Sequence, residues 1–375
     1  MIYLDNSATT YPKPLKVRQT CASAMQMSAN PGRGGHALAM KASEEIFRAR
    51  QTAADFFHCG KVENIVFTLN CTTALNTVLK GILHSGDHAV VSCMEHNAVM
   101  RPLEKLSQRG VSYTMAEVYP CDNDKTVDSF RKAINAKTKL ILCTHASNVW
   151  GIKLPIERIA ALAHEYGVLF GVDAAQTAGL VPIDVSKMDF LCTAGHKGLY
   201  GPMGTGMLIV SGDTIPDTLT EGGTGSNSMS FEQPSELPDR LESGTPNFSG
   251  IAGLRAGMEF VTSRKPENIA KHEFMLIKHL YKELSKLRQV KLYTVEPEPE
   301  YFVPILSFNV EGRDSEEVSA ELNKHGIAVR AGLHCSPAAH KMMNTLETGA
   351  VRVSPSVFTR MNDMDYFLSV IRKLS

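Results

Sequence analysis

The sequence predicts an α/β protein with a large domain built on a mainly parallel seven-stranded sheet and a smaller C-terminal α+β domain. Short β-branched runs alternate with helical patterns through the first two thirds of the chain, and the pattern then changes. Such alternation requires crossover connections, which give parallel strands with ligand sites at their carboxyl ends. The length of 375 residues also exceeds one ordinary core and fits two domains.

Seven short β-branched runs have the length of buried strands. They cover residues 65–68, 89–92, 111–115, 140–143, 169–172, 190–193 and 207–210. Helical patterns lie between most of them, at residues 73–83, 98–108, 127–135 and 156–166. Together these elements predict the sheet and the covering helices of the large domain, which we place at residues 15–255.

After residue 210 the sequence becomes rich in Gly, Ser and Pro, so residues 221–247 are predicted to be ordered loops near a site. One long helix is predicted at about residues 251–287, leading out of the sheet. The smaller domain receives the remaining strands and helices, at residues 305–310, 328–330, 315–325 and 364–373. We place this domain at residues 256–375 together with the N-terminal segment 1–14.

The composition argues against several classes of protein. Lys plus Arg and Asp plus Glu both total 39, so no global field favours nucleic acid or an anionic membrane. No apolar run approaches the roughly 18 to 20 residues of a membrane span, and the N-terminus lacks a signal-peptide pattern. Eight scattered cysteines without a C-x-x-C pair argue against a disulfide framework and a thiolate zinc site. We expect a cytoplasmic protein that acts on a small molecule without a metal.

A lysine and a carboxylate at strand ends are the first candidates for chemistry. Lys197 follows the predicted strand 190–193 and stands between glycines, on the constrained kind of loop that Schiff-base chemistry needs. Asp173 ends a very apolar strand, where an unpaired carboxylate is costly. A pyridinium nitrogen would pair with this carboxylate, and the protonated ring would act as an electron sink. Taken singly, a solvated loop lysine and a helix cap are the plainer interpretations.

Two further positions fit a ring that carries a phosphate. Thr72 and Thr73 follow a strand and open a helix, whose free N–H groups and dipole favour a phosphate. His96 also follows a strand and is a candidate to lie flat against an aromatic ring. A lone histidine in this position is more often structural.

These residues resemble the class V aminotransferases of fold type I and, within them, the cysteine desulfurase and selenocysteine lyase family. The resemblance covers nearly the whole chain. It is carried, in order, by motifs at residues 3–8, 95–96, 147–151, 172–176, 195–197, 200–202 and 242–247. It implies a homodimeric enzyme that uses pyridoxal 5′-phosphate, with Lys197 as the Schiff-base lysine and Asp173 on the pyridine nitrogen. His96 is implied to stack on the ring and to take part in catalysis.

The resemblance also implies the remaining contacts to the cofactor. Gln176 and Asn148 would lie near its phenolic oxygen. The implied phosphate ligands are Thr72, Thr73, His196 and, from the other subunit of the dimer, Gly244 and Thr245. Two positions depart from the family. Ala194 replaces a usual phosphate-binding serine, with Thr193 one residue further back, and Cys71 replaces a glycine, where it would crowd the phosphate loop slightly.

A cysteine in a small, polar, loop-like stretch distinguishes a desulfurase from a general transaminase. Cys335 follows His334, and nearby cations lower the pKa of a thiol. An isolated cysteine is more often a small buried hydrophobe. The interval around Cys335 resembles the second group of desulfurases, which includes selenocysteine lyases. In that family Arg352 corresponds to the arginine that binds the substrate carboxylate. Its neighbours in substrate binding would be Arg330, His36 and Asn148.

The resemblance implies conversion of L-cysteine to L-alanine. Lys197 would act as the base at Cα, and the Cys335 thiolate would take the sulfur as a persulfide for an acceptor protein or a reductant. A selenocysteine lyase, or another class V aminotransferase or C–S lyase in which Cys335 is incidental, remains an alternative. A nicotinamide dehydrogenase is disfavoured because residues 201–206 are not G-x-G-x-x-G and follow the lysine. A non-catalytic sulfur-relay or scaffold protein would not need Lys197, Asp173 and Arg352 together.

Overall fold

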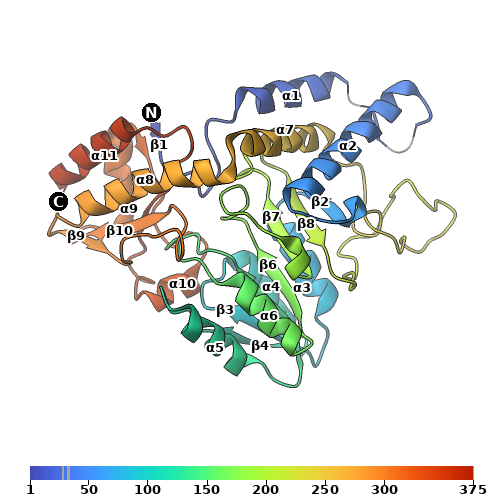
Figure 1. The fold of residues 1–375 in the computed structure, drawn as a ribbon, viewed down its shortest axis with the longest axis horizontal. Helices are drawn as coiled ribbons and strands as arrows, with labels where there is room; N and C mark the ends of the chain where they lie inside the picture. Colours follow the sequence, from blue (N-terminus) through green and yellow to red (C-terminus); the bar gives the residue numbers. More distant parts are fainter. Residues whose placement is uncertain (28, 32–33, 375) are drawn as a thin grey trace.

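A seven-stranded sheet forms the centre of the computed structural model, which describes residues 1–27, 29–31 and 34–374 (Figure 1). Its strand order is β2-β8-β7-β6-β5-β3-β4, and only β8 runs antiparallel to its neighbours. The strands are β2 (Ile65–Thr68), β3 (His88–Ser92), β4 (Ser112–Ala116), β5 (Thr138–Thr144), β6 (Leu169–Asp173), β7 (Phe190–Ala194) and β8 (Gly206–Val210). The predicted mainly parallel seven-stranded sheet is therefore confirmed.

Helices cover both faces of this sheet, because its central strands are apolar on both sides. In β5, Ile141 belongs to one buried cluster, whereas Leu140 and Leu142 belong to another. This alternation is typical of parallel strands buried on two faces. The second cluster includes α3 (Cys71–Ile82) and α4 (Asn97–Ser107). Helices on the first side are α2 (Ala37–Phe56), α5 (Asn123–Ala133), α6 (Ile156–Glu165) and α7 (Phe248–Arg264), and α1 (Leu15–Gln26) packs on α7.

A smaller sheet and three helices share a separate apolar core. The antiparallel strands are β9 (Val290–Leu292), β10 (Leu306–Val310) and β12 (Val351–Val353), and the helices are α8 (Pro266–Leu284), α9 (Ser315–Lys324) and α11 (Met361–Leu374). The N-terminal β1 (Ile2–Tyr3) pairs with β11 (Ile327–Ala328), which brings the first residues to this part of the molecule. The division at residue 255 stays a prediction, and that residue lies inside α7.

The prediction of one long helix at residues 251–287 is wrong. The chain forms two helices there, α7 and α8, with a break at Lys265, whose φ of 66° is left-handed. Pro266 follows the break, and a proline disfavours helical backbone in the residue before it. At the first position of α8 the same proline is well tolerated, because its missing N–H would have no partner there.

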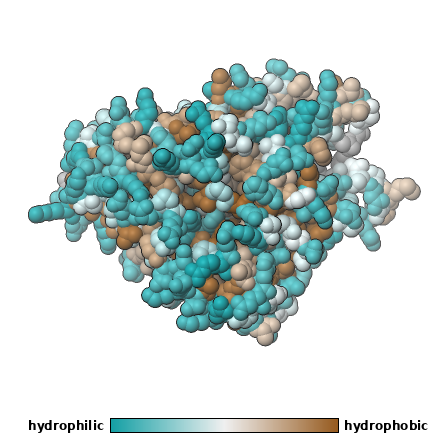
Figure 2. Space-filling model, in the orientation of Figure 1, coloured by the Kyte–Doolittle hydropathy of each residue, from teal (hydrophilic) through white to brown (hydrophobic). Residues whose placement is uncertain are grey.

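The surface of the molecule is predominantly polar. Figure 2 shows hydrophilic side chains over most of one face, with apolar side chains gathered toward its centre. Among the described residues, no helix is both long enough and apolar enough to cross a membrane.

Candidate active site

A cavity of about 230 Å³ lies at the carboxyl ends of the central strands and brings most of the predicted site residues together. Residues from the sheet, from the starts of α3 and α4 and from the C-terminal part all line it. The predicted residues among them are Thr72, His96, Asn148, Asp173, Gln176, His196, Lys197, Arg330, Cys335 and Arg352. The position agrees with the general location of ligand sites in open α/β sheets.

Four predicted site residues do not line this cavity. Both the N–H and the hydroxyl of Thr73 contact Asn70 Oδ1, at 2.9 and 3.2 Å, because Asn70 caps α3. His36 caps α2 and accepts from Ala39 N at 3.3 Å. Gly244 and Thr245 are exposed in the segment between β8 and α7. Their roles toward the cofactor or substrate stay predictions.

The loop that carries Lys197 is held by the N-terminal segment. Thr10 N donates to His196 O at 3.0 Å, and Thr10 Oγ1 donates to Lys197 O at 3.2 Å. At Gly198 the loop packs closely against the backbone of Ala178, because a Cβ at this position would lie 2.3 Å from Ala178 O. Burial lowers the pKa of Lys197, which favours the neutral amine needed to form a Schiff base.

Asp173, the last residue of β6, presents one carboxylate oxygen to the cavity. Its Oδ1 accepts from Ala175 N at 2.9 Å and from the Cys71 thiol at 3.4 Å. Burial raises the pKa of Cys71, so this thiol is a protonated donor. Within the described residues no donor is bonded to Oδ2. An oxygen left in this way suits a protonated pyridine nitrogen.

Two histidines of the cavity lining suit an aromatic ring that carries a phosphate. His96 caps α4, accepting from Ala98 N at 3.0 Å, and burial lowers its pKa to about 4, so that it is neutral. Burial also lowers the pKa of His196 to about 4, and His196 Nδ1 is buried with no hydrogen-bond partner among the described residues. Leaving such an atom unpaired costs about 1–3 kcal/mol. A phosphate at the nearby start of α3 would supply the partner.

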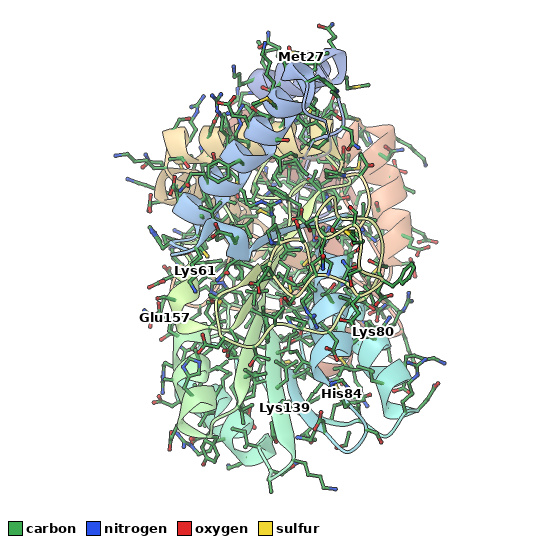
Figure 3. All side chains as sticks on the ribbon, turned by 90° about the vertical axis from the view of Figure 1, so that its right-hand side faces the viewer. Met27, Lys61, Lys80, His84, Lys139 and Glu157 are labelled. Carbon is green, nitrogen blue, oxygen red and sulfur yellow. The ribbon has the colours of Figure 1, made fainter. Side chains whose placement is uncertain are left out.

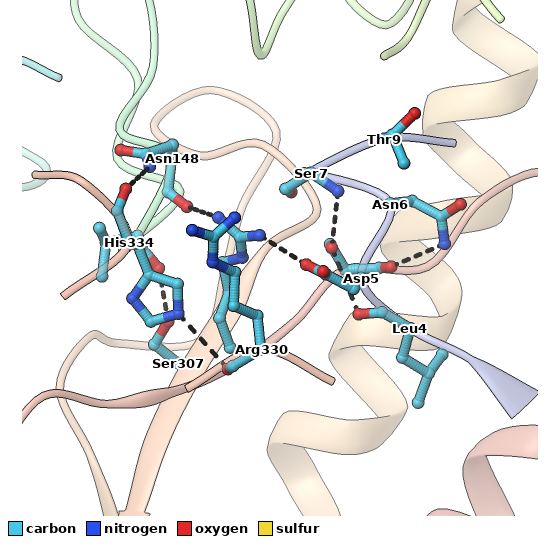
Figure 4. A network of polar contacts seen from close by, with 12 residues as sticks. Leu4, Asp5, Asn6, Ser7, Thr9, Asn148, Ser307, Arg330 and His334 are labelled. Atoms are coloured by element: carbon cyan, nitrogen blue, oxygen red, sulfur yellow. Dashed lines mark hydrogen bonds and ion pairs between the residues drawn. The ribbon is translucent and has the colours of Figure 1, made fainter. Parts of the chain in front are cut away.

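Arg352 lies in the cavity wall as a fully buried guanidinium. Its Nη1 donates to Asn148 O at 2.8 Å and its Nη2 donates to Asp5 Oδ1 at 2.7 Å. Figure 4 labels these two partners, Asn148 and Asp5. Burial lowers the pKa of Arg352, and Asp5 opposes this effect. The Nε atom has no partner among the described residues. These bonds use two of the five N–H groups of the guanidinium, so the group is fixed in orientation and keeps further donors for an anion.

The loop that carries Cys335 has a left-handed backbone at two successive residues, with φ of 52° at His334 and 57° at Cys335. Residues other than glycine are strained there by about 1–3 kcal/mol each. Hydrogen bonds from other elements stabilise the loop. Asn148 Nδ2 donates to His334 O at 2.8 Å, Asn97 N donates to Cys335 O at 2.8 Å, and Ser336 Oγ donates to Asn148 Oδ1 at 2.6 Å. The exposed thiol therefore has a fixed position at the edge of the cavity.

The family model of the class-V aminotransferases matches residues 2–367 of the chain. The chain belongs to this family. Enzymes of the class-V family that act as cysteine desulfurases depend on pyridoxal 5′-phosphate, and the cavity described above has the donors to fit that cofactor.

Several curated proteins that are similar to this chain are named cysteine desulfurases or probable cysteine desulfurases. A probable cysteine desulfurase from Methanothermobacter thermautotrophicus is 34% identical over 368 residues, which cover 94% of this chain and 89% of the relative. A probable cysteine desulfurase from Pyrococcus abyssi is 32% identical, covering 100% and 94%. The cysteine desulfurase of Escherichia coli O157:H7 is 30% identical, covering 100% and 93%. The resemblance noted in the sequence is confirmed.

Solved structures agree with this family assignment. The apo structure of the cysteine desulfurase from Thermococcus onnurineus NA1 matches with a TM-score of 0.92 at 32% identity, covering 100% of this chain and 94% of that one. The cysteine desulfurase CsdA from Escherichia coli matches with a TM-score of 0.88 at 26% identity, covering 99% and 94%. The predicted fold type I architecture is thereby confirmed for this class-V protein.

The sequence alone did not single out three residues that this class-V protein uses to build the cavity. Asp5 orients Arg352, and its signal was its place in the motif at residues 3–8. Ser336 braces the Cys335 loop and directly follows the cysteine. Glu95 is buried beside His96, where it accepts from Thr144 N at 2.9 Å and burial raises its pKa to about 8. It joins the end of β3 to the end of β5.

We expect Ser336→Ala to slow sulfur transfer to Cys335 by about 2- to 10-fold, which corresponds to one hydrogen bond of about 0.5–1.5 kcal/mol. The strained loop would lose the bond to Asn148, while cofactor content and substrate KM stay the same. Stopped reactions followed by mass spectrometry would measure the rate. Ser211→Ala is the control, because Ser211 Oγ also donates to a backbone oxygen, Val185 O at 2.6 Å, and follows the antiparallel β8 at the edge of the sheet opposite the cavity. Equal effects of both variants would contradict the positioning role.

Proposed function

We propose that this chain uses pyridoxal 5′-phosphate to convert L-cysteine to L-alanine and leaves the substrate sulfur as a persulfide on Cys335. One observation carries the proposal. Lys197, Asp173, Arg352 and Cys335 come from four separate parts of the chain and line a single cavity. A transaminase would use the first three, whereas the thiol is the addition that sulfur chemistry requires.

Lys197 and Asp173 are the residues that would engage the reactive part of the cofactor. When bound, the cofactor ring supplies an electron sink for a carbanion at the substrate Cα. Lys197 Nζ would hold the cofactor covalently and then, once the substrate amine replaces it, remove the Cα proton. Asp173 Oδ2 would keep the ring nitrogen protonated. His96 would lie against the ring, and Gln176 and Asn148 near its phenolic oxygen.

Cys335 is the proposed sulfur acceptor within the chain. Its thiolate Sγ would attack the sulfur of the substrate, so that a new S–S bond forms while the C–S bond breaks. The electron pair stays on the carbon fragment, which is protonated and leaves as alanine. No external oxidant is required. Arg330 lines the same cavity as Cys335.

The experiment that tests this function combines two measurements on purified, cofactor-loaded protein. Alanine release from L-cysteine measures turnover, and digestion followed by mass spectrometry measures an added sulfur on the peptide that contains Cys335. We expect one sulfur on that peptide after a single turnover. Alanine release without any bound sulfur would contradict a desulfurase and favour another C–S lyase.

We expect Arg352→Lys to raise the KM for L-cysteine by about 10- to 100-fold, because losing a charge-assisted hydrogen bond costs about 1.5–3 kcal/mol. An ammonium cannot reproduce the planar fork that holds Asp5, Asn148 and a carboxylate together. Steady-state kinetics would measure the change. Arg330→Lys serves as the comparison. If the KM of the variant equals that of the wild type, the substrate carboxylate does not bind to Arg352.

We also propose that the enzyme is a homodimer in which Gly244 and Thr245 reach the partner's cofactor phosphate. The segment that carries them exposes Met229 and Phe231 completely, at 99% and 110%. The surface of α2 adds further exposed apolar side chains, namely Leu38, Met40 and Phe47. Large apolar side chains that are exposed in this way support burial against another chain. Light scattering should give twice the chain mass of 41.0 kDa.

A further inference from the structure

A second cavity of about 370 Å³ adjoins the catalytic one on the outside. Cys335, His96 and Thr72 line both cavities, so the thiol stands at their boundary. A sulfur atom added to Cys335 would therefore be adjacent to two spaces. The inner space is occupied by cofactor and substrate in the proposed reaction, which leaves the outer groove for whatever removes the sulfur.

Two packed helices form the walls of the outer groove. On α3 the lining residues Thr72, Asn76 and Lys80 are each four positions apart. On α4, Arg101 and Lys105 continue a row of the same spacing that begins at residue 97. Because residues four apart share one face of a helix, each helix presents a single stripe to the groove. The stripe from residue 72 to residue 80 is about 12 Å long at about 1.5 Å per residue.

The groove is positively charged, although the chain as a whole has a formal charge of +0. Lys80, Arg101 and Lys105 are all exposed and line it, and none of its described lining residues is acidic. In the described part of the chain, no carboxylate forms an ion pair with any of the three. Figure 3 shows Lys80 at the outer surface of α3. Three uncompensated cations beside one thiol create a local field that attracts anions.

We propose that this groove is the docking site of the sulfur acceptor, and that the acceptor presents a thiol on an acidic polypeptide segment. This inference rests on the proposed function, since it requires a persulfide on Cys335. A length of about 12 Å accommodates three to four residues of an extended segment at about 3.3 Å per residue, which is more than a single small thiol would fill. The charge selects acidic over basic segments, and complementary charge accelerates productive encounters.

The transfer step in the groove is balanced without an oxidant. The thiolate of the acceptor attacks the outer sulfur of the Cys335 persulfide and forms a new S–S bond. The S–S bond to Cys335 breaks, and its electron pair leaves with Cys335 as a thiolate. The acceptor then carries the persulfide, and Cys335 is ready for the next substrate.

Single-turnover transfer to synthetic peptides tests the inference on the cofactor-loaded, full-length protein. After one equivalent of L-cysteine has formed the persulfide, a cysteine-containing peptide rich in Glu is compared with a matched peptide rich in Lys. We expect the acidic peptide to react about tenfold faster or more, within the range of electrostatic steering. The difference should shrink from about 0.01 M to about 0.15 M salt, where the Debye length falls from about 30 to about 8 Å.

Charge reversal of the groove supplies the decisive variant. The double variant Lys80→Glu/Lys105→Glu should lose most of the preference for the acidic peptide, while alanine release and persulfide formation on Cys335 stay unchanged. Lys132→Glu/Lys373→Glu is the matched control, because all four lysines stand in the last turn of a helix. This control should behave like the wild type.

Three outcomes would overturn the inference. If sulfur is transferred to both peptides at the same rate, and the charge reversal does not change this rate, the acceptor does not bind in the groove. Glutathione, a small anionic thiol, could react as fast as the acidic peptide and lose as much rate in the double variant. That result would show that the groove binds small molecules and not a polypeptide. A change of oligomeric state in the double variant would assign this face to contact between copies of the chain. Absence of the Cys335 persulfide in the wild type would instead contradict the proposed function itself.

Discussion

Replacing Lys197 with alanine is expected to lower alanine formation by about 10²- to 10⁴-fold or more, the range that a positioned general base contributes. The protein should still fold, because the loop is held through backbone contacts to Thr10 and through Gly198, and none of these needs the lysine side chain. Cofactor should still bind without a covalent bond, through Asp173 and the residues around its phosphate. The variant would then bind the cofactor but would not convert L-cysteine.

Borohydride reduction followed by mass spectrometry measures the covalent link directly. In the wild type the reduced cofactor should be found on the peptide that contains Lys197, and in Lys197→Ala on no peptide. Lys187→Ala is the control, because Lys187 pairs with Glu157 on the surface, away from the cavity. If the Lys197 variant forms alanine at the wild-type rate, Lys197 does not take part in the reaction.

Replacing Cys335 with alanine is expected to abolish sulfur transfer while leaving the rest of the site in place. Desulfuration of L-cysteine should fall by at least about 10²-fold, the lower end of what one catalytic group contributes. No persulfide should form. The absorption of bound cofactor should persist, because none of the proposed cofactor contacts involves the Cys335 side chain. Some activity toward selenocysteine should also remain, since the weaker C–Se bond allows elimination without attack by a thiolate.

The other thiols of the chain provide the controls for Cys335. Cys121→Ala should behave like the wild type, because Cys121 is also exposed but does not line either cavity. An added sulfur on the peptide containing Cys71 or Cys192 would overturn the assignment. Both of those thiols are buried, and burial raises the pKa of each well above its ordinary value, so neither is expected to be a thiolate.

The large sheet could be predicted because each of its strands is indicated by the residues of that strand alone. Strands such as β5 and β6 are short apolar runs buried on both faces, and helices of clear periodicity separate them. Lys197 and Asp173 could be predicted for the same reason, since each follows directly from a strand end. The break between α7 and α8 was not predicted, although Pro266 marks it in the sequence.

The parts that could not be predicted depend on contacts between distant segments. The strands β9 and β12 have only three residues each, and they become strands by pairing with β10. The left-handed backbone at Cys335 is stabilised by Asn97 and Asn148, and neither residue is near it in sequence. Nothing in the sequence around Cys335 specifies these partners.

The ion pair between Asp5 and Arg352 has a consequence for how the enzyme is made. These residues are 347 positions apart, and Arg352 also contacts Asn148, 204 positions away. A chain emerging from the ribosome contains every strand of the large sheet once residue 210 is made, 142 positions before Arg352, the arginine proposed to bind the substrate. Unfinished or C-terminally clipped chains would therefore hold the Lys197 loop without Arg352 and Cys335. We therefore expect chains that end before residue 335 to draw no sulfur from cysteine.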